Sequence, residues 1–146
     1  MSMNTSQAAA YSILSQWNYT SYVNSTGETV YWYYLSELYN ITFDQVYAEH
    51  GLSSLTKPFD TSTLYLAIND PSSATWFNGS FNHTSRTAFT REVSLLLQKL
   101  GPVSTWTWGR VHILEIASLT GLSALGLGPY PMYGDSHRRK ALIIWL

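Results

Sequence analysis

The sequence of 146 residues contains no cysteine. This absence excludes disulfides, thiolate zinc sites, iron–sulfur clusters and cysteine nucleophiles. No apolar run approaches the roughly 18–20 residues that a membrane span needs, so we expect no integral membrane protein. Charge is scarce as well, since only 12% of the residues are charged and the net charge is −1. Nucleic-acid-binding proteins are usually clearly basic, so we expect no nucleic-acid partner.

The short motifs of nucleotide and metal binding are also missing. Neither GxGxxG nor GxxxxGK[ST] occurs, and the four histidines form no HExxH or i, i+4 pair. Asp135, Ser136 and His137 have the residue types of a hydrolase triad, but consecutive side chains point in different directions. The residue chemistry therefore predicts no catalytic residue, no cofactor-binding residue and no metal ligand in this chain.

What is present predicts a mainly α fold. Apolar spacing and capping residues indicate about five short helices, over residues 6–17, 27–39, 42–50, 61–69 and 85–100. The strongest is 85–100, in which apolar residues from Phe89 to Leu100 share one face before Gly101 and Pro102 end the helix. Thr5 or Ser6 would cap the first helix.

Two capping boxes delimit the middle helices. Ser25-x-x-Glu28 would open the helix over 27–39, and Asn40 would stop it. Thr42-x-x-Gln45 would then open the helix over 42–50.

The last third of the chain differs in character. Residues 103–117 are rich in β-branched and aromatic residues and predict an extended strand, whereas 121–135 contain too many glycines and prolines for either regular element. We therefore divide the chain into a helical region, 1–102, and an extended, Gly/Pro-rich region, 103–146, which together form one part of a larger domain.

Six of the seven asparagines begin an Asn-X-Ser/Thr triplet, namely Asn4, Asn18, Asn24, Asn40, Asn78 and Asn82. The excess predicts an exported, extracellular or cell-surface parent protein that is glycosylated at several of these sites. The alternative is that a Ser/Thr-rich composition produces the triplets by accident. The N-terminal residues lack a basic stretch followed by an apolar one, so we expect no signal peptide in this chain.

One segment is more specific than the rest. Residues 106–112 read WxWGxxH, and an extended apolar stretch, Leu127-Gly-Pro-Tyr-Pro131 and Gly134-Asp135 follow. In this order, after a helix, the segment resembles the C-terminal part of the β subunit of penicillin acylases, which are N-terminal-nucleophile hydrolases. The family-motif residues in this chain are Trp106, Trp108, Gly109, His112, Gly134 and Asp135.

The resemblance implies a fragment of the αββα N-terminal-nucleophile hydrolase fold. The family hydrolyses amides of N-acyl compounds such as penicillins or acyl homoserine lactones, with an N-terminal serine as nucleophile. That serine lies upstream of the matching region, as do the calcium ligands, so the resemblance assigns no catalytic residue and no calcium site to this chain. The isolated chain should be inactive.

The resemblance also predicts partners. In the family this region packs against the rest of the α and β subunits, so its apolar residues would otherwise remain exposed and drive formation of a homo-oligomer. Trp106 and Trp108 should share a face of the extended segment as packing anchors, with His112 a buried, hydrogen-bonded histidine. The alternative function is a non-catalytic helical interaction module derived from the same scaffold.

Overall fold

The computed structural model describes residues 3–54, 61–70, 72, 76–77 and 80–134. These residues form four α-helices: α1 (Thr5–Gln16), α2 (Thr26–Glu49), α3 (Thr61–Asn69) and α5 (Phe81–Leu100). Two short antiparallel strands follow, β1 (Ile113–Ile116) and β2 (Leu127–Pro131). The fold is therefore mainly helical with a small two-stranded sheet.

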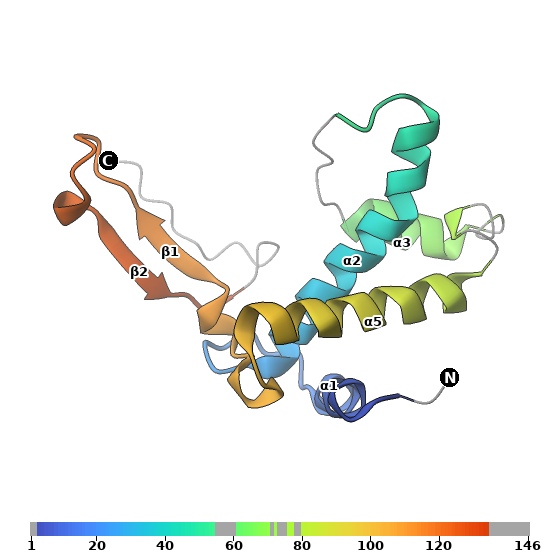
Figure 1. Cartoon of the computed structure of the whole chain (residues 1–146), viewed down its shortest axis with the longest axis horizontal. Helices are drawn as coiled ribbons and strands as arrows, with labels where there is room; N and C mark the ends of the chain where they lie inside the picture. Colours follow the sequence, from blue (N-terminus) through green and yellow to red (C-terminus); the bar gives the residue numbers. More distant parts are fainter. Residues whose placement is uncertain (1–2, 55–60, 71, 73–75, 78–79, 135–146) are drawn as a thin grey trace.

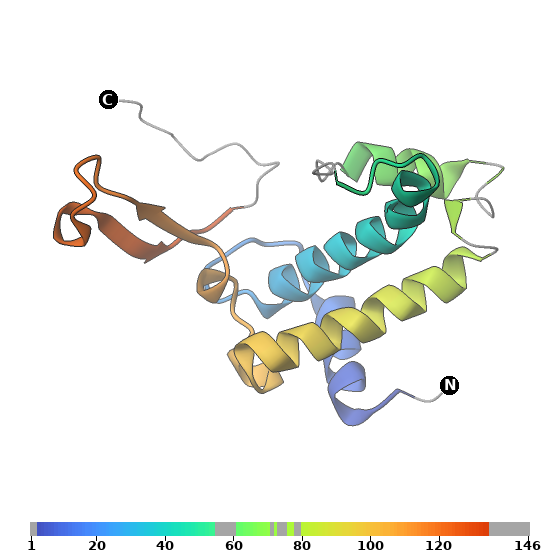
Figure 2. The same ribbon diagram turned by 45° about the horizontal axis from the view of Figure 1, so that its top comes forward.

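The two long helices, α2 and α5, run across one another and form the body of the molecule (Figures 1 and 2). Helix α1 packs at one end of this pair, and α3 lies beside the far end of α2. The hairpin of β1 and β2 projects from the helical body as an arm (Figure 1).

Side-chain caps set the helix starts. At α1 the cap is Asn4, not Thr5 or Ser6: its side chain accepts from the Gln7 amide, and the Gln7 side chain accepts from the Asn4 amide. At α5 the cap is Ser80, and the helix begins at Phe81, four residues earlier than the predicted start at 85. At α2 the predicted cap Ser25 is confirmed, and the buried carboxylate of Glu28 accepts from the Ser21 hydroxyl.

The predicted break at Asn40 is wrong, because α2 runs without interruption from Thr26 to Glu49. Asn40 is exposed on its surface, and the hydroxyl of Thr42 donates to the Leu38 carbonyl one turn earlier instead of capping a new helix. Leu38 and Phe43, on either side of the expected break, are both buried in the same cluster. Tertiary packing thus overrides the local capping signal.

Two apolar clusters hold the helices together. The first joins the C-terminal half of α2 to α3 and α5, and its buried residues are Leu38, Tyr39, Phe43, Leu64, Ala67, Phe77 and Ala88. The second joins α1, the start of α2 and the end of α5, with buried residues Ala10, Val30, Val93, Leu96 and Trp106. Trp106 therefore extends the helical core into the C-terminal region.

The C-terminal region differs from the prediction of one extended segment over 103–117. Residues Val103–Thr105 and Trp108–Arg110 form single 3-10 turns, and only Ile113–Ile116 is a strand. Its partner β2 lies in the segment expected to be irregular. Gly128 permits this pairing, because it has a φ of +105° and a Cβ there would collide with the Leu114 carbonyl.

None of the helices among the described residues is both long and apolar enough to cross a membrane.

Candidate functional site

The residues of the WxWGxxH motif lie where the helical body meets the hairpin. Trp106, fully buried, packs in the second cluster and donates from Nε1 to the Gly101 carbonyl at 2.9 Å. Gly101 is the C-cap of α5. The first tryptophan of the motif therefore fastens the segment to the end of the helix that precedes it.

Trp108 has a different environment. Its Nε1 donates to the Gly134 carbonyl at 2.8 Å, and its ring stacks on His112 at a centroid distance of 4.8 Å. On the α2 side its ring lies nearly parallel to Trp32, at 6.4 Å. The prediction that the two tryptophans share one face of an extended strand is wrong, because the 3-10 turns send Trp106 into the core and Trp108 toward the hairpin.

His112 connects the two sides of the hairpin at its base. Its backbone carbonyl accepts from the Met132 amide at 2.8 Å, and its Nδ1 lies 3.3 Å from the Met132 carbonyl. The side chain is half-buried, so it is hydrogen-bonded as predicted but less enclosed. Its ring and backbone act together to hold the end of β2 beside the start of β1.

Gly109 is where the motif touches the loop before α2. Its amide donates to the Val23 carbonyl at 2.7 Å. A Cβ at this position would collide with the Val23 side chain and lie 2.9 Å from Cβ of Pro131. The glycine is thus required by close packing between three segments that are far apart in the sequence.

The same loop receives two more hydrogen bonds, from Trp108 N to the Ser25 carbonyl at 3.0 Å and from Gly134 N to the Ser21 carbonyl at 2.8 Å. Gly134 therefore lies with the motif, whereas Asp135 is outside the described residues. We call the assembly of residues 21–25, 106–112 and 132–134 the joint.

Arg110 also belongs to the joint, although the sequence analysis did not single it out. One guanidinium nitrogen donates to the carbonyls of Leu100 and Thr105, both at 3.0 Å. It thus bonds the last carbonyl of α5, where a cation is also favourable for the helix dipole, and the last carbonyl of the 3-10 turn that follows. The sequence signal for a role of Arg110 was its position within the WxWGxxH motif, directly after Gly109.

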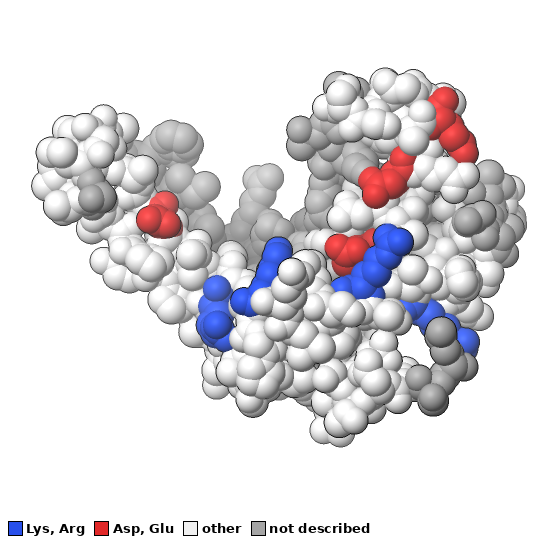
Figure 3. Space-filling model, in the orientation of Figure 1, with Lys and Arg blue, Asp and Glu red and all other residues white. Residues whose placement is uncertain are grey.

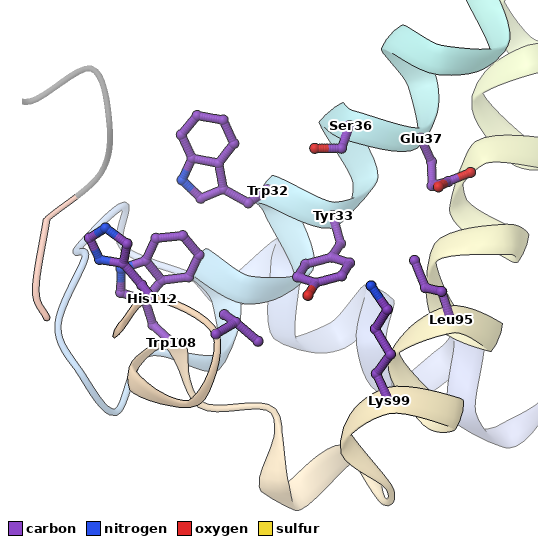
Figure 4. Close-up of a pocket in the computed structure, with 9 residues that line it drawn as sticks. Trp32, Tyr33, Ser36, Glu37, Leu95, Lys99, Trp108 and His112 are labelled. Carbon is purple, nitrogen blue, oxygen red and sulfur yellow. The ribbon is translucent and has the colours of Figure 1, made fainter. Parts of the chain in front are cut away.

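A groove of about 380 Å³ opens between α2, α5 and the joint. Figure 4 shows Trp32, Trp108 and His112 at one end and Glu37 toward the other. Lys99 points across the groove, with its Nζ 5.5 Å from the centre of the Tyr33 ring. The groove is walled mainly by apolar and aromatic groups, with one charge of each sign: Trp32, Tyr33, Ser36, Glu37, Leu95, Lys99, Trp108, Val111 and His112.

Glu92 is a buried acid that the sequence analysis missed. It lies on α5, fully buried, and neither carboxyl oxygen has a hydrogen-bond partner among the described residues. Burial, reinforced by the negative charge of Glu37 on α2, raises the pKa of Glu92 to about 9. Its spacing of four residues from both Ala88 and Leu96, which are buried, placed it on the apolar face of the helix.

Within the described part of the chain, no group of three or more His, Asp or Glu residues is placed to hold a metal ion. The Asp135, Ser136 and His137 run lies outside it. The side chains of Trp106, Trp108, Arg110 and His112 and several backbone amides of the joint form hydrogen bonds between segments, and these bonds position the hairpin.

The Asn-X-Ser/Thr triplets lie in different settings. Asn18 and Asn24 are exposed in the loop before α2, and the Thr20 hydroxyl donates to Asn18 Oδ1 at 2.6 Å. Asn40 and Asn82 are exposed on helices, but their threonines, two residues on, are buried and donate to backbone carbonyls. Asn4 caps α1, and Asn78 lies outside the described residues.

Comparison with known proteins gives one match. The sequence model of a protein family described as penicillin amidase matches residues 2–143, nearly the whole chain. Neither the curated proteins nor the solved structures include a match.

Proposed function

The chain belongs to the penicillin amidase family, and from this we propose that it is the C-terminal part of an acylase-like amidase. The parent enzyme would hydrolyse the amide bond of N-acyl compounds such as penicillins or acyl homoserine lactones. In this proposal the N-terminal nucleophile and its oxyanion hole belong to the upstream part of the parent, and this chain supplies a fragment of the αββα fold.

The family match carries the proposal of an amidase, and the joint supports a framework role for this part of it. The motif residues of the resemblance are engaged in structure: Trp106 closes the core, Trp108 and Gly134 share a hydrogen bond, and Gly109 fits where a side chain does not. A segment of this kind holds a framework in place around a site that other residues supply. We infer that the chain alone does not hydrolyse amides.

The rest of the proposal concerns the setting of the parent. We place it outside the cell or at the cell surface, with Asn18 and Asn24 as the glycosylation sites best placed by their exposure in a loop. Its partners are the remaining α and β subunit residues, and any calcium would be bound by upstream residues. An isolated chain would self-associate through exposed apolar surface.

A non-catalytic interaction module remains the second candidate. The exposed apolar hairpin favours it, because such a surface marks an interaction site whether or not the parent performs chemistry.

A chimera separates the two candidates. This chain would replace the matching segment of an active penicillin amidase, with the same enzyme truncated at that point as the control. We expect the chimera, but not the truncated enzyme, to mature and hydrolyse a phenylacetyl amide. A chimera that matures but stays inactive would favour the interaction module.

The purified chain provides the complementary test. It should not hydrolyse a phenylacetyl or long-chain acyl amide. Hydrolysis that Ser2→Ala abolishes would contradict the proposal, because it would identify a nucleophile within the chain itself.

A further inference from the structure

The hairpin arm has one face that is apolar, uncharged and open. Successive residues of a strand point to opposite faces, so Leu114 and Ile116 of β1, two positions apart, share a face. Their cross-strand partners are Tyr130 and Leu127, which are three positions apart because the register shifts between Leu114 and Ile116. We call these four residues the apolar face; they are 42%, 49%, 52% and 56% exposed, respectively.

Charge distinguishes the two faces of the hairpin. Between Val111 and Gly134 the only Asp, Glu, Lys or Arg is Glu115, which alternates with Leu114 and Ile116 and so points to the opposite face with Ile113. On the side that Figure 3 presents, the projecting arm is uncharged except for one acidic patch. An object that packs on the apolar face would therefore bury no charge.

A two-stranded hairpin is marginally stable in water without a further layer. The joint holds only its base, through Met132, Gly134 and Gly109. Contact of the apolar face with another surface would thus stabilise the arm.

Addition of a strand at the hairpin edges is disfavoured. At the base of the hairpin the Met132 amide donates to the His112 carbonyl, and along β2 Pro129 and Pro131 occupy two of the five positions, with Pro131 opposite Ile113. Proline has no N–H to offer at that edge. At the edge of β1, a two-fold pairing would bring the two Glu115 side chains close together, where like charges destabilise a sheet.

We propose that the apolar face packs against the same face of a second copy of this chain, across a two-fold axis. Such an isologous contact places apolar residues against apolar residues and keeps both Glu115 side chains on the outer surfaces. The proposal specifies the surface and the symmetry of the self-association proposed above, and it does not depend on the acylase assignment.

The available area sets the expected strength. With about half of each side chain exposed and total residue areas on the order of 200 Å², the apolar face offers about 400 Å² per copy and about 800 Å² per dimer. Stable dimers usually bury at least about 1,200 Å². Leu119, Leu122 and Leu125 at the tip, which are 106%, 61% and 63% exposed, can supply the remainder. We therefore expect a weak dimer, with a Kd in the micromolar range.

Two neighbouring substitutions test the face directly. Leu114→Lys and Ile113→Lys change adjacent residues of the same strand, 42% and 47% exposed, that point to opposite faces. Sedimentation velocity would be measured on the 146-residue chain from about 1 to about 100 μM, a range that brackets the expected Kd. We expect Leu114→Lys to weaken association at least about tenfold, and Ile113→Lys to change it less than about twofold.

Circular dichroism would establish that each variant is folded. If Leu114→Lys does not fold, Tyr130→Lys tests the same face from β2, with the same expected loss. A wild-type chain that stays monomeric throughout the range would overturn the proposal, as would equal weakening by both substitutions. The amidase tests measure hydrolysis and this one measures mass, so failure of one is distinguishable from failure of the other.

Discussion

Glu92 makes the stability of this chain depend on pH in an unusual direction. Its pKa is about 9 in the folded protein, against 4.5 for an ordinary glutamate, because the carboxyl is buried without a hydrogen-bond partner among the described residues and the negative charge of Glu37 opposes its ionisation. Between these two pKa values the folded chain holds one more proton than the unfolded chain. The stability is therefore fully present below pH 4.5 and is lost as the pH rises toward 9.

Each pH unit in this interval costs about 1.4 kcal/mol. From pH 4.5 to pH 7, Glu92 should thus lower the free energy of unfolding by about 3 kcal/mol, a large part of the stability of a typical domain. Glu92→Gln retains the shape and polarity of the protonated carboxyl but cannot ionise. We expect this variant to match the wild type near pH 4.5 and to exceed its stability by about 3 kcal/mol at pH 7.

The assay is urea unfolding followed by fluorescence of the six tryptophans at several pH values between 4.5 and 8. Glu37→Gln should reduce the slope of stability against pH only in part, because burial is the larger cause of the shift. Glu115→Gln, on the exposed hairpin, is the matched control for removal of one charge. If wild type and Glu92→Gln lose stability in parallel over this range, Glu92 does not remain protonated on folding and the reasoning fails.

Two further predictions concern packing and capping. Gly109→Ala should destabilise the chain by about 2–3 kcal/mol, because the added Cβ collides with neighbours at the joint. Gly51→Ala, where a Cβ meets open space, should cost only about 1 kcal/mol from its positive φ. Urea unfolding compares the two variants, and equal losses of stability would show that contact is not the cause. Asn4→Ala should cost about 1 kcal/mol by removing the reciprocal bonds with Gln7. Thermal melts of this variant and of a control, Asn24→Ala, test the effect. The control should be nearly neutral, and similar losses of stability in the two variants would count against the cap.

The elements that the sequence predicted well are those in which local signals agree. Helix α3 occupies the predicted residues 61–69, and α5 follows the repeat from Phe89 to Leu100 up to the glycine cap. Ser25 caps α2 as expected. In these places the apolar spacing and the cap point to the same boundary, so no distant contact is needed to choose it.

The C-terminal hairpin was harder to predict because its pairing is not local. Ten residues separate β1 from β2, and glycines and prolines in β2 are typical of irregular structure. Its register depends on contacts at the joint, where Ser25 and Val23, about 85 positions earlier in the chain, accept hydrogen bonds from Trp108 and Gly109. Neither propensity nor periodicity contains such information.

The sequence by itself determined the helical class, the start of α2, the span of α3, the end of α5 and the family, because these depend on local periodicity, capping residues and the WxWGxxH pattern. Only the tertiary structure decided that α2 continues through Asn40, that Trp106 and Trp108 diverge, and that Glu92 is enclosed between helices. The physical reason is that these outcomes depend on which surfaces meet. Burial of Leu38 and Phe43 outweighs a local cap, and a charge on an apolar helix face becomes costly only when another helix covers it.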